Sequence, residues 1–314
     1  KVITSALIDG REVRNAKIAA ETLRPHHTGY GDTYYWNPIT GDDSYDGKSW
    51  ESGVKTFAKA HDLVEDGHHD VIIAVADAPG ISLVTESITI SKNYTFLRGP
   101  GQDFRMQPTT TDGTPTITIT GFGVEISGMH VTTAPTGVQD AIVVEDGADF
   151  ALIDKIWSKG ATGNFLSIHG NGIYHQVWNT FVDECKGDGI HFDGNIRHTV
   201  LRNVELANCI GNGVTIQGGD GGTKFARNSI IAHDNIIHGS QGYGIYFGVG
   251  TEKNLVGPGT TLYLNALGDV QDDGTNFDLR STPSITTWTE QEKLESLAWS
   301  RKASDNSEQV NLKI

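Results

Sequence analysis

The sequence predicts an all-β fold of the solenoid class, in which about eight similar coils stack along one axis. Three observations lead to this prediction: a repeat of 24 residues, a short alternating strand inside each repeat, and glycines where each repeat turns. The first three copies start at Gly163, Gly187 and Gly211, and a looser copy starts at Gly242. One turn of a parallel β-solenoid takes about this many residues, which places neighbouring coils about 4.8 Å apart.

Each repeat contains one strand whose apolar residues are expected to point inward. Leu166, Ile190 and Val214 occupy equivalent positions and should stack as one interior row. By the same alternation, His191 and Asp193 should point outward. Further strands are predicted at residues 87–90, 95–97, 116–119, 124–126 and 141–144, with the last coil near 261–264.

A second column of equivalent positions carries small polar residues. Asn179, Asn203 and Asn235 each lie between apolar residues, and Asp154 occupies the matching place one repeat earlier. Each amide can bond to a neighbouring amide or to the backbone. We therefore expect an internal ladder of hydrogen bonds at one turn of the coil.

Two further positions have structural interpretations. Cys185 and Cys209 are 24 residues apart and are expected to be stacked, buried thiols; a disulfide between neighbouring coils is the alternative. Asp188 stands where the next repeat has Asn212, at a turn that favours an Asx residue. A structural role is therefore expected for Asp188.

The chain before the repeat has its own signature. A turn at 41–47, Gly-Asp-Asp-Ser-Tyr-Asp-Gly, precedes an amphipathic stretch at 54–64 and an apolar run at 71–75. This order resembles the opening of pectate-lyase-like right-handed parallel β-helix proteins, in which the helix caps the first coil. The resemblance covers about residues 34–280 and implies a single-stranded right-handed parallel β-helix with a capping helix.

The two ends of the chain differ from the coils. A short helix is predicted over 15–23, and another of about three turns follows a linker at 281–284. Helices this short are not stable alone in water, so the second needs a partner, either the end of the β-helix or further copies of itself. A solenoid with such ends resembles, in architecture alone, phage tail spikes and tail fibres, which are usually parallel homotrimers.

The resemblance to tail spikes implies three segments and a function. Residues 1–31 would be an attachment segment and linker that contacts other virion tail proteins, 32–280 the β-helix domain, and 281–314 a helical oligomerisation segment. The expected function is host-surface glycan recognition by a rigid homotrimer in the extracellular virion tail. The alternatives are a polysaccharide depolymerase of the same fold, either lyase or glycoside hydrolase, and a purely structural tail or baseplate component.

Composition argues against two classes of partner. The formal net charge is −15, whereas nucleic-acid binding requires concentrated Lys and Arg. No apolar run approaches the roughly 18 residues that a membrane-spanning helix needs. Neither nucleic-acid binding nor membrane insertion is therefore expected.

Stacking of the coils gathers outward side chains into two neighbouring rows. One row holds Ser167, His191, Thr215 and Tyr246, and the other holds His169, Asp193, Gln217 and Gly248. We select His169, His191, Asp193, Gln217 and Tyr246 as candidate ligand-binding residues. Such a patch can bind sugar through hydrogen bonds or perform acid–base work on a glycosidic bond or a uronic acid; an ordinary solvated or interface surface is the third interpretation.

No catalytic residues can be assigned, and whether the protein is an enzyme stays open. Glycoside hydrolysis usually needs two carboxylates at a defined separation, but Asp188 and Asp193 fall on different parts of one coil. Polygalacturonases that share the fold carry an Asp-Asp and a Gly-His-Gly motif, and neither occurs among these coils. The two Asp-Asp pairs of the sequence lie elsewhere, at Asp42-Asp43 in the entry turn and at Asp272-Asp273 near the end. The calcium-binding acidic cluster and basic residue of β-helix lyases have no clear equivalent either.

The turn at 41–47 raises one question about metals. Asp42, Ser44 and Asp46 match the start of an EF-hand calcium loop, but the twelfth position is Gly53 instead of Glu. A turn built from Asx hydrogen bonds is the expected interpretation, and calcium is the alternative. No other metal and no cofactor is predicted.

Overall fold

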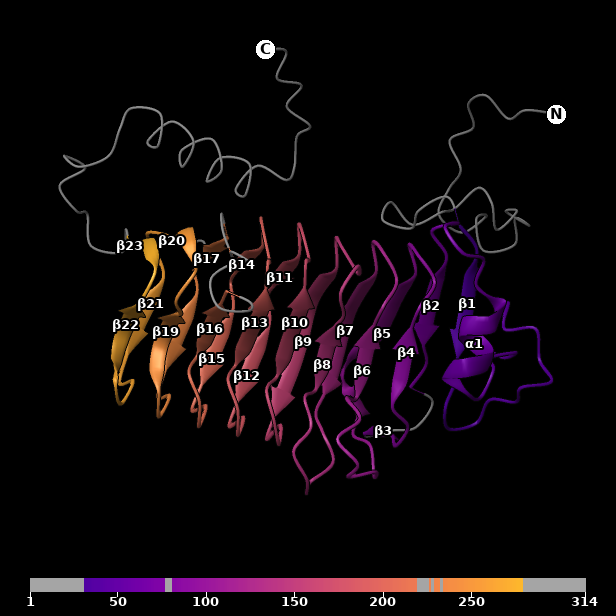
Figure 1. Cartoon of the computed structure of the whole chain (residues 1–314). Helices are drawn as coiled ribbons and strands as arrows, with labels where there is room; N and C mark the ends of the chain where they lie inside the picture. The colour runs from indigo at the N-terminus through magenta and orange to yellow at the C-terminus, as the bar shows by residue number, and fades with distance from the viewer. Residues whose placement is uncertain (1–30, 77–80, 219–225, 227–228, 232–233, 279–314) are drawn as a thin grey trace, which may run out of the picture.

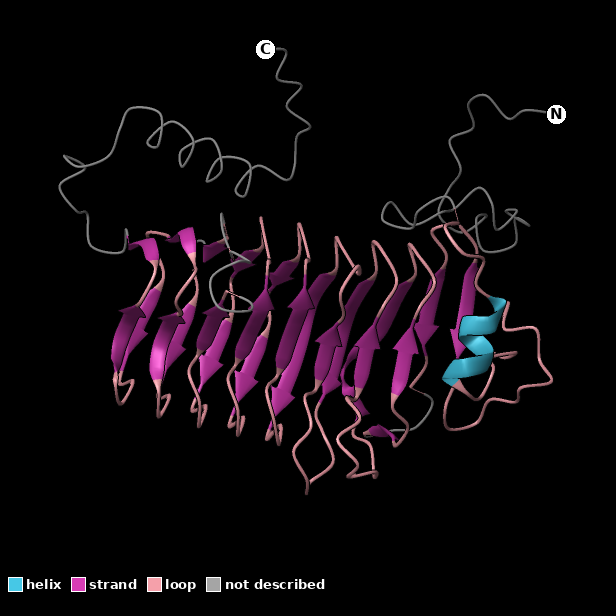
Figure 2. Cartoon of the chain, in the orientation of Figure 1, coloured by secondary structure: helices cyan, strands magenta, loops and turns pink. Residues whose placement is uncertain are grey.

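The computed structural model describes residues 31–76, 81–218, 226, 229–231 and 234–278. The described chain is nearly all β and forms a parallel solenoid of about eight turns, with a single α-helix near its beginning (Figures 1 and 2). The predicted parallel β-helix is therefore confirmed. The predicted terminal helices and the segment 281–314 lie outside the described residues, as does 1–31 apart from Gly31. No described helix is long and apolar enough to cross a membrane.

The strands form two sheets that run along the solenoid. Sheet A has fifteen strands: β1 (Thr33–Trp36), β2 (Val71–Ala74), β3 (Ser82–Val84), β5 (Phe96–Met106), β7 (Glu125–Val131), β9 (Leu152–Lys159), β11 (Gln176–Trp178), β12 (Phe181–Asp183), β14 (Val200–Arg202), β15 (Glu205–Ala207), β17 (Ile230–Ile231), β18 (Ile236–His238), β20 (Glu252–Val256), β21 (Thr261–Tyr263) and β23 (Thr275–Asp278). Sheet B has eight strands: β4 (Ile88–Ile90), β6 (Ile117–Ile119), β8 (Ile142–Val144), β10 (Leu166–Gly170), β13 (Ile190–Gly194), β16 (Val214–Gln217), β19 (Tyr243–Phe247) and β22 (Gly268–Asp272).

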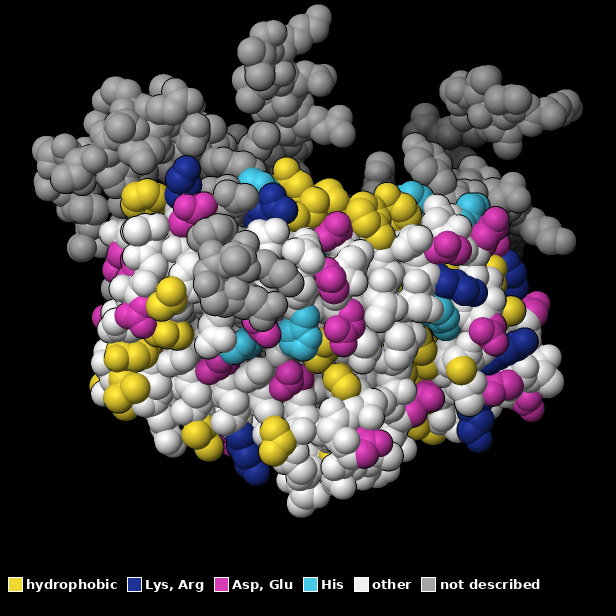
Figure 3. Space-filling view, viewed as in Figure 1, with side chains coloured by type: hydrophobic (Ala, Val, Ile, Leu, Met, Phe, Trp, Pro, Cys, Tyr) yellow, Lys and Arg dark blue, Asp and Glu magenta, His cyan; other side chains and the backbone are white. Residues whose placement is uncertain are grey.

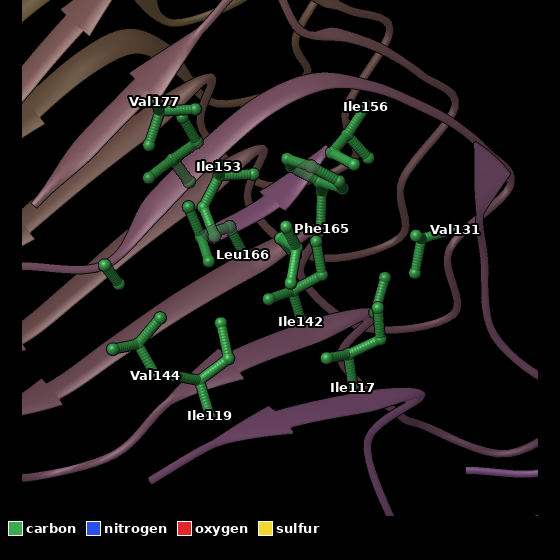
Figure 4. Packing of buried hydrophobic residues seen from close by; sticks show 14 of the residues in the cluster. Ile117, Ile119, Val131, Ile142, Val144, Ile153, Ile156, Phe165, Leu166 and Val177 are labelled. Atoms are coloured by element: carbon green, nitrogen blue, oxygen red, sulfur yellow. The ribbon is translucent and has the colours of Figure 1, made fainter. Parts of the chain in front are cut away.

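The register of sheet B follows the 24-residue repeat. Leu166 lies opposite Ile190, and Ile190 lies opposite Val214, all in parallel pairing. These three side chains are fully buried, which confirms the predicted interior row. Figure 4 shows the same packing around Ile142 and Leu166, where apolar side chains of successive coils fill one continuous core.

The coils continue further than the repeat predicted. Strands β22 and β23 add another layer beyond the expected last coil near 261–264. In this layer Gly268 lies opposite Tyr243, so the positions equivalent to the paired glycines Gly242 and Gly244 carry other residues. The sequence signal therefore fades before the fold ends.

The predicted ladder of small polar residues exists, but it lies outside the coil. The Nδ2 of Asn179 donates to Asp154 Oδ1 and the Nδ2 of Asn203 donates to Asn179 Oδ1, both at 2.8 Å. We call these three residues the amide ladder. Asn179 and Asn203 are exposed, because buried Val177 and Thr180 fill the interior of the corner. The expectation of an internal ladder is therefore wrong.

Asn235 does not belong to the amide ladder. The left-handed corner position, with φ 48° at Asn179 and 51° at Asn203, is taken in the next coil by Asp234, at φ 65°. Asx residues tolerate this conformation better than most side chains. Asn235 lies one residue further and is buried, where its amide bonds to the backbone of Leu201 and Val204.

A short helix covers the first coil. Helix α1 (Phe57–Leu63) lies within the predicted range 54–64 and begins after Thr56, whose side chain accepts from Lys59 N. Phe57 packs edge-on against Trp36, with ring centroids 5.2 Å apart. The helix therefore closes the apolar interior of the solenoid at this end.

The two cysteines are buried inside the coils. Cys185 and Cys209 are free thiols and are both 0% exposed. The predicted pair of buried thiols is confirmed, and the alternative of a disulfide is excluded.

Candidate functional site

The outer face of sheet B holds the five candidate residues on four neighbouring strands. His169 lies opposite Asp193, and Asp193 lies opposite Gln217. In the other row, His191 and Tyr246 both lie opposite Thr215, one on each side. Both rows inferred from spacing therefore stand in register. Figure 3 shows histidine and acidic side chains side by side on this face of the molecule.

His191 is paired with a carboxylate of its own coil. Its Nδ1 lies 2.7 Å from Asp188 Oδ2, and the two side chains are only 22% and 14% exposed. The other ring nitrogen, Nε2, makes no hydrogen bond with a described residue. This nitrogen is therefore left to meet a ligand, while Asp188 fixes the orientation of the ring.

Asp188 has a second task in a ladder of Asx residues at the turn before sheet B. Its Oδ1 accepts from the backbone of Asn212, and its own backbone N–H donates to Asn164 Oδ1, each at 2.7 Å. Asn164 N in turn donates to Asp140 Oδ1. We call Asp140, Asn164, Asp188 and Asn212 the turn ladder. The predicted structural role of Asp188 is confirmed, and one oxygen remains for His191.

The pKa values of the pair shift in opposite directions. Burial alone lowers the pKa of His191, but the hydrogen bond and charge of Asp188 outweigh burial and raise it. Burial raises the pKa of Asp188, but hydrogen bonds from His191, Thr215 and Asn212 outweigh burial and lower it. An imidazolium–carboxylate pair is therefore the favoured form over a widened pH range.

A second histidine and acid lie beside this pair. His169 Nδ1 is 3.7 Å from Glu145 Oε2, and both side chains are more exposed than those of His191 and Asp188. Asp193 is exposed as well. Ring nitrogens and carboxylate oxygens therefore alternate across three neighbouring coils, so the patch presents both donors and acceptors to solvent.

Gln217 and Tyr246 extend the patch along the solenoid. Gln217 is exposed beside Asp193, whereas Tyr246 lies two strands from β13. The Tyr246 hydroxyl donates to Asp273 Oδ2 at 3.0 Å, and this bond raises the pKa of Tyr246. The structure thus brings four of the five candidates together and places Tyr246 at the far edge.

An aromatic ladder follows another turn of the coil, and the sequence analysis missed it. Six rings from six coils contact in series, with centroids 4.4–5.3 Å apart: His69, Tyr94, Phe122, Phe150, Tyr174 and His198. Five of them, all but Phe122, adopt left-handed φ between 53° and 63°. The signal in the sequence was an aromatic residue or a histidine two or three residues before each of six strands of sheet A: β2, β5, β7, β9, β11 and β14. Spacings of 24 to 28 residues concealed it.

The turn at 41–47 has its own hydrogen bonds. Asp42 Oδ1 accepts from Ser44 N, and Asp46 Oδ1 accepts from Lys48 N and Ser52 Oγ. These are the bonds of an Asx-built turn. Among the described residues, no three or more His, Cys, Asp or Glu side chains are grouped to hold a metal ion. Calcium remains only the alternative interpretation of this turn.

Comparisons with known proteins show similarity of fold. No protein-family model and no curated protein matches this sequence. Similar solved structures include ORF18 of Geobacillus virus E2 (13% identity, 70% of this chain, 56% of that chain, TM-score 0.37) and the Dettilon tailspike protein gp208 (14%, 82%, 51%, 0.45). Another is the pectate lyase Pel9A (15%, 85%, 85%, 0.44).

The chain spans about half the length of the two viral proteins. At these identities and TM-scores the similarity says nothing about activity.

Proposed function

We propose that this protein is a subunit of a phage tail spike or tail fibre that recognises a host-surface glycan through the outer face of sheet B. The observation that carries the proposal is the in-register patch of His169, His191 and Asp193, with the His191–Asp188 pair beside it. Sugar hydroxyls both donate and accept hydrogen bonds. A rigid surface of alternating donors and acceptors matches that chemistry.

The remaining parts of the proposal concern assembly and location. A homotrimer is proposed, with residues 281–314 holding the copies together and 1–31 joining other proteins of the extracellular virion tail. Rigidity supports this role, because each coil shares its backbone hydrogen bonds with the next along both sheets. Sedimentation of the full chain tests assembly, and a monomer at micromolar concentration would contradict the trimer.

Glycan binding is tested with the full chain against a panel of acidic and neutral capsular polysaccharides. The variants are His191→Ala and Asp193→Asn, with Thr118→Ala, from the same sheet three coils away, as the matched control. Loss of a hydrogen bond to a charged group should weaken binding roughly tenfold or more. Unchanged affinity in both variants would refute the sheet B site.

The second candidate function is a polysaccharide depolymerase, which the His191–Asp188 pair favours. A histidine held by a carboxylate is a suitable general acid or base. New reducing ends, or ultraviolet absorbance from an unsaturated uronic acid, would establish catalysis, and His191→Ala should abolish it. Absence of both binding and turnover would leave the third candidate, a purely structural tail component.

A further inference from the structure

A groove of about 180 Å³ opens at the corner of sheet A, between the strands β11 and β14 on one side and β12, β15 and β18 on the other. It crosses three coils. One wall is the left-handed turn with Asn179, Asn203 and Asp234, and the other is formed by Phe181, Glu205 and Ile236. None of these residues belongs to the sheet B patch.

The hydrogen bonds of the amide ladder, which runs along one wall of this groove, all point the same way. Asp154 can only accept, so Asn179 must donate to it and Asn203 must donate to Asn179. The carbonyl oxygen of Asn203 is consequently the accepting end of the chain. Chained hydrogen bonds polarise one another, which strengthens that acceptor. Exposed Asp234 follows in the next coil, so acceptors gather at this end.

Phe181 supplies an apolar surface within reach of these acceptors. It is half-buried, lies between Trp157 and Glu205 in the register of sheet A, and makes no ring contact with another described residue. Phe181 lines the groove, and no described aromatic ring stacks on it there. In the aromatic ladder, by contrast, Phe150 contacts Phe122 and stacks on Tyr174, which also stacks on His198.

The volume of the groove and the charge of its lining residues limit which class of ligand can bind there. The groove is smaller than the roughly 300–1,000 Å³ of typical small-molecule pockets, so it suits one sugar ring instead of a whole oligosaccharide. Its acceptors include the carboxylates of Glu205 and Asp234, and no Lys or Arg lines it. A uronic acid would meet like charge here, whereas hydroxyl or ammonium groups would find partners.

We propose that this groove is a sugar-binding site, separate from the sheet B patch, for a hydroxyl-rich sugar residue without negative charge. One face of the sugar ring packs on Phe181, and its hydroxyl groups donate to Asn203 and Asp234. The site stands or falls independently of the function proposed for sheet B, because the two surfaces share no residue.

The test is saturation-transfer NMR and calorimetry on the full chain with short oligosaccharides of glucose, glucosamine and galacturonic acid. Phe181→Leu removes the ring but keeps an apolar side chain. Asn203→Gly removes the amide and tolerates the left-handed turn. Phe150→Leu is the matched control, since it removes an exposed ring that already contacts the rings of Phe122 and Tyr174. Thermal melting verifies that every variant is folded.

Binding of glucose or glucosamine oligosaccharides, weakened roughly fivefold or more by Phe181→Leu and Asn203→Gly but not by Phe150→Leu, supports the site. Binding should also survive His191→Ala, which separates this groove from sheet B. Preference for galacturonic acid, equal loss in Phe150→Leu, or no binding of any of the three sugars overturns it.

Discussion

Two histidines of neighbouring coils, His175 and His191, show how differently the solenoid treats one side chain. His175 lies inside at 1% exposure, and neither of its ring nitrogens has a hydrogen-bond partner among the described residues. His191 lies on sheet B and is held by Asp188. Burial lowers the pKa of His175 to about 4, whereas the carboxylate raises that of His191. Burial therefore keeps His175 neutral, whereas the outer face holds His191 in a pair with a carboxylate.

The largest expected effect is loss of stability in acid through His175. The unfolded state takes up its proton near pH 6.5 and the folded state only near pH 4, so stability falls as the pH drops through this window. Each pH unit is worth about 1.4 kcal/mol, so the loss is about 3 kcal/mol. His175→Leu should flatten this dependence in denaturant unfolding.

Wild type is the reference for that experiment, because burial also lowers the pKa of His130 to about 4. Only the difference between the two proteins reports on His175. Parallel stability curves between pH 6.5 and pH 4 would show that this histidine is not held neutral inside the coil.

A smaller loss of stability is expected in the aromatic ladder. It contains a histidine in a third environment, His198, whose ring is stacked on a tyrosine. Tyr174 stacks on both Phe150 and His198, at 5.0 and 4.8 Å. Aromatic pairs contribute about 0.5–1.5 kcal/mol each, so Tyr174→Ala should cost about 1–3 kcal/mol. Tyr174→Gly should be less damaging, since glycine adopts φ 60° without strain. If alanine and glycine unfolded at the same denaturant concentration, strain at this turn would have no part in the ladder.

The smallest expected change in stability is at Asp188, where substitution should instead change the pKa of His191. Asp188→Asn keeps an oxygen that can accept the backbone hydrogen bond of the turn ladder, as the amide oxygens of Asn164 and Asn212 do. It removes the charge beside His191. The pKa of His191 should fall below its wild-type value, because the hydrogen bond and charge of Asp188 no longer oppose burial and only the charges of Asp193 and Asp140 still do. An NMR titration of the ring protons measures this, and an unchanged titration would mean that the pair is not coupled.

The opposite pKa shifts of His191 and Asp188 define the pH range in which the pair stabilises the fold. His191, with its raised pKa, stabilises the fold below pH 6.5 and loses that contribution as the pH rises through its folded pKa. Asp188, with its lowered pKa, contributes above pH 3.8 and loses that contribution as the pH falls through its own folded pKa. Asp188→Asn should therefore cost most between these values, by about 1 kcal/mol, the net contribution of one typical hydrogen bond.

The sequence predicted the register of the coils well, and their outer surfaces less well. Spacing alone placed His169 opposite Asp193, because strands 24 residues apart pair directly. Spacing could not tell on which side of a corner Asn179 projects, since that depends on the left-handed backbone and on what fills the interior. It also suggested a single role for Asp188, although its two oxygens serve the turn and the imidazole separately.

The aromatic ladder and the groove escaped prediction for related reasons. Irregular spacing hid the rings from the repeat, and a groove arises only where two strands of one coil meet at an angle. Phe181 and Glu205 read as ordinary strand residues in the sequence, and the register of β12 and β15 is what sets them side by side.

Because sheet B keeps a strict register, the solenoid can be lengthened only by whole coils. Adding or removing one residue would turn a strand's inward row outward, but duplicating a whole coil would leave inside and outside unchanged. Each such duplication would lengthen the molecule by about 4.8 Å. The length of the molecule can thus change in equal steps of one coil, while the same side chains stay on the outer surface.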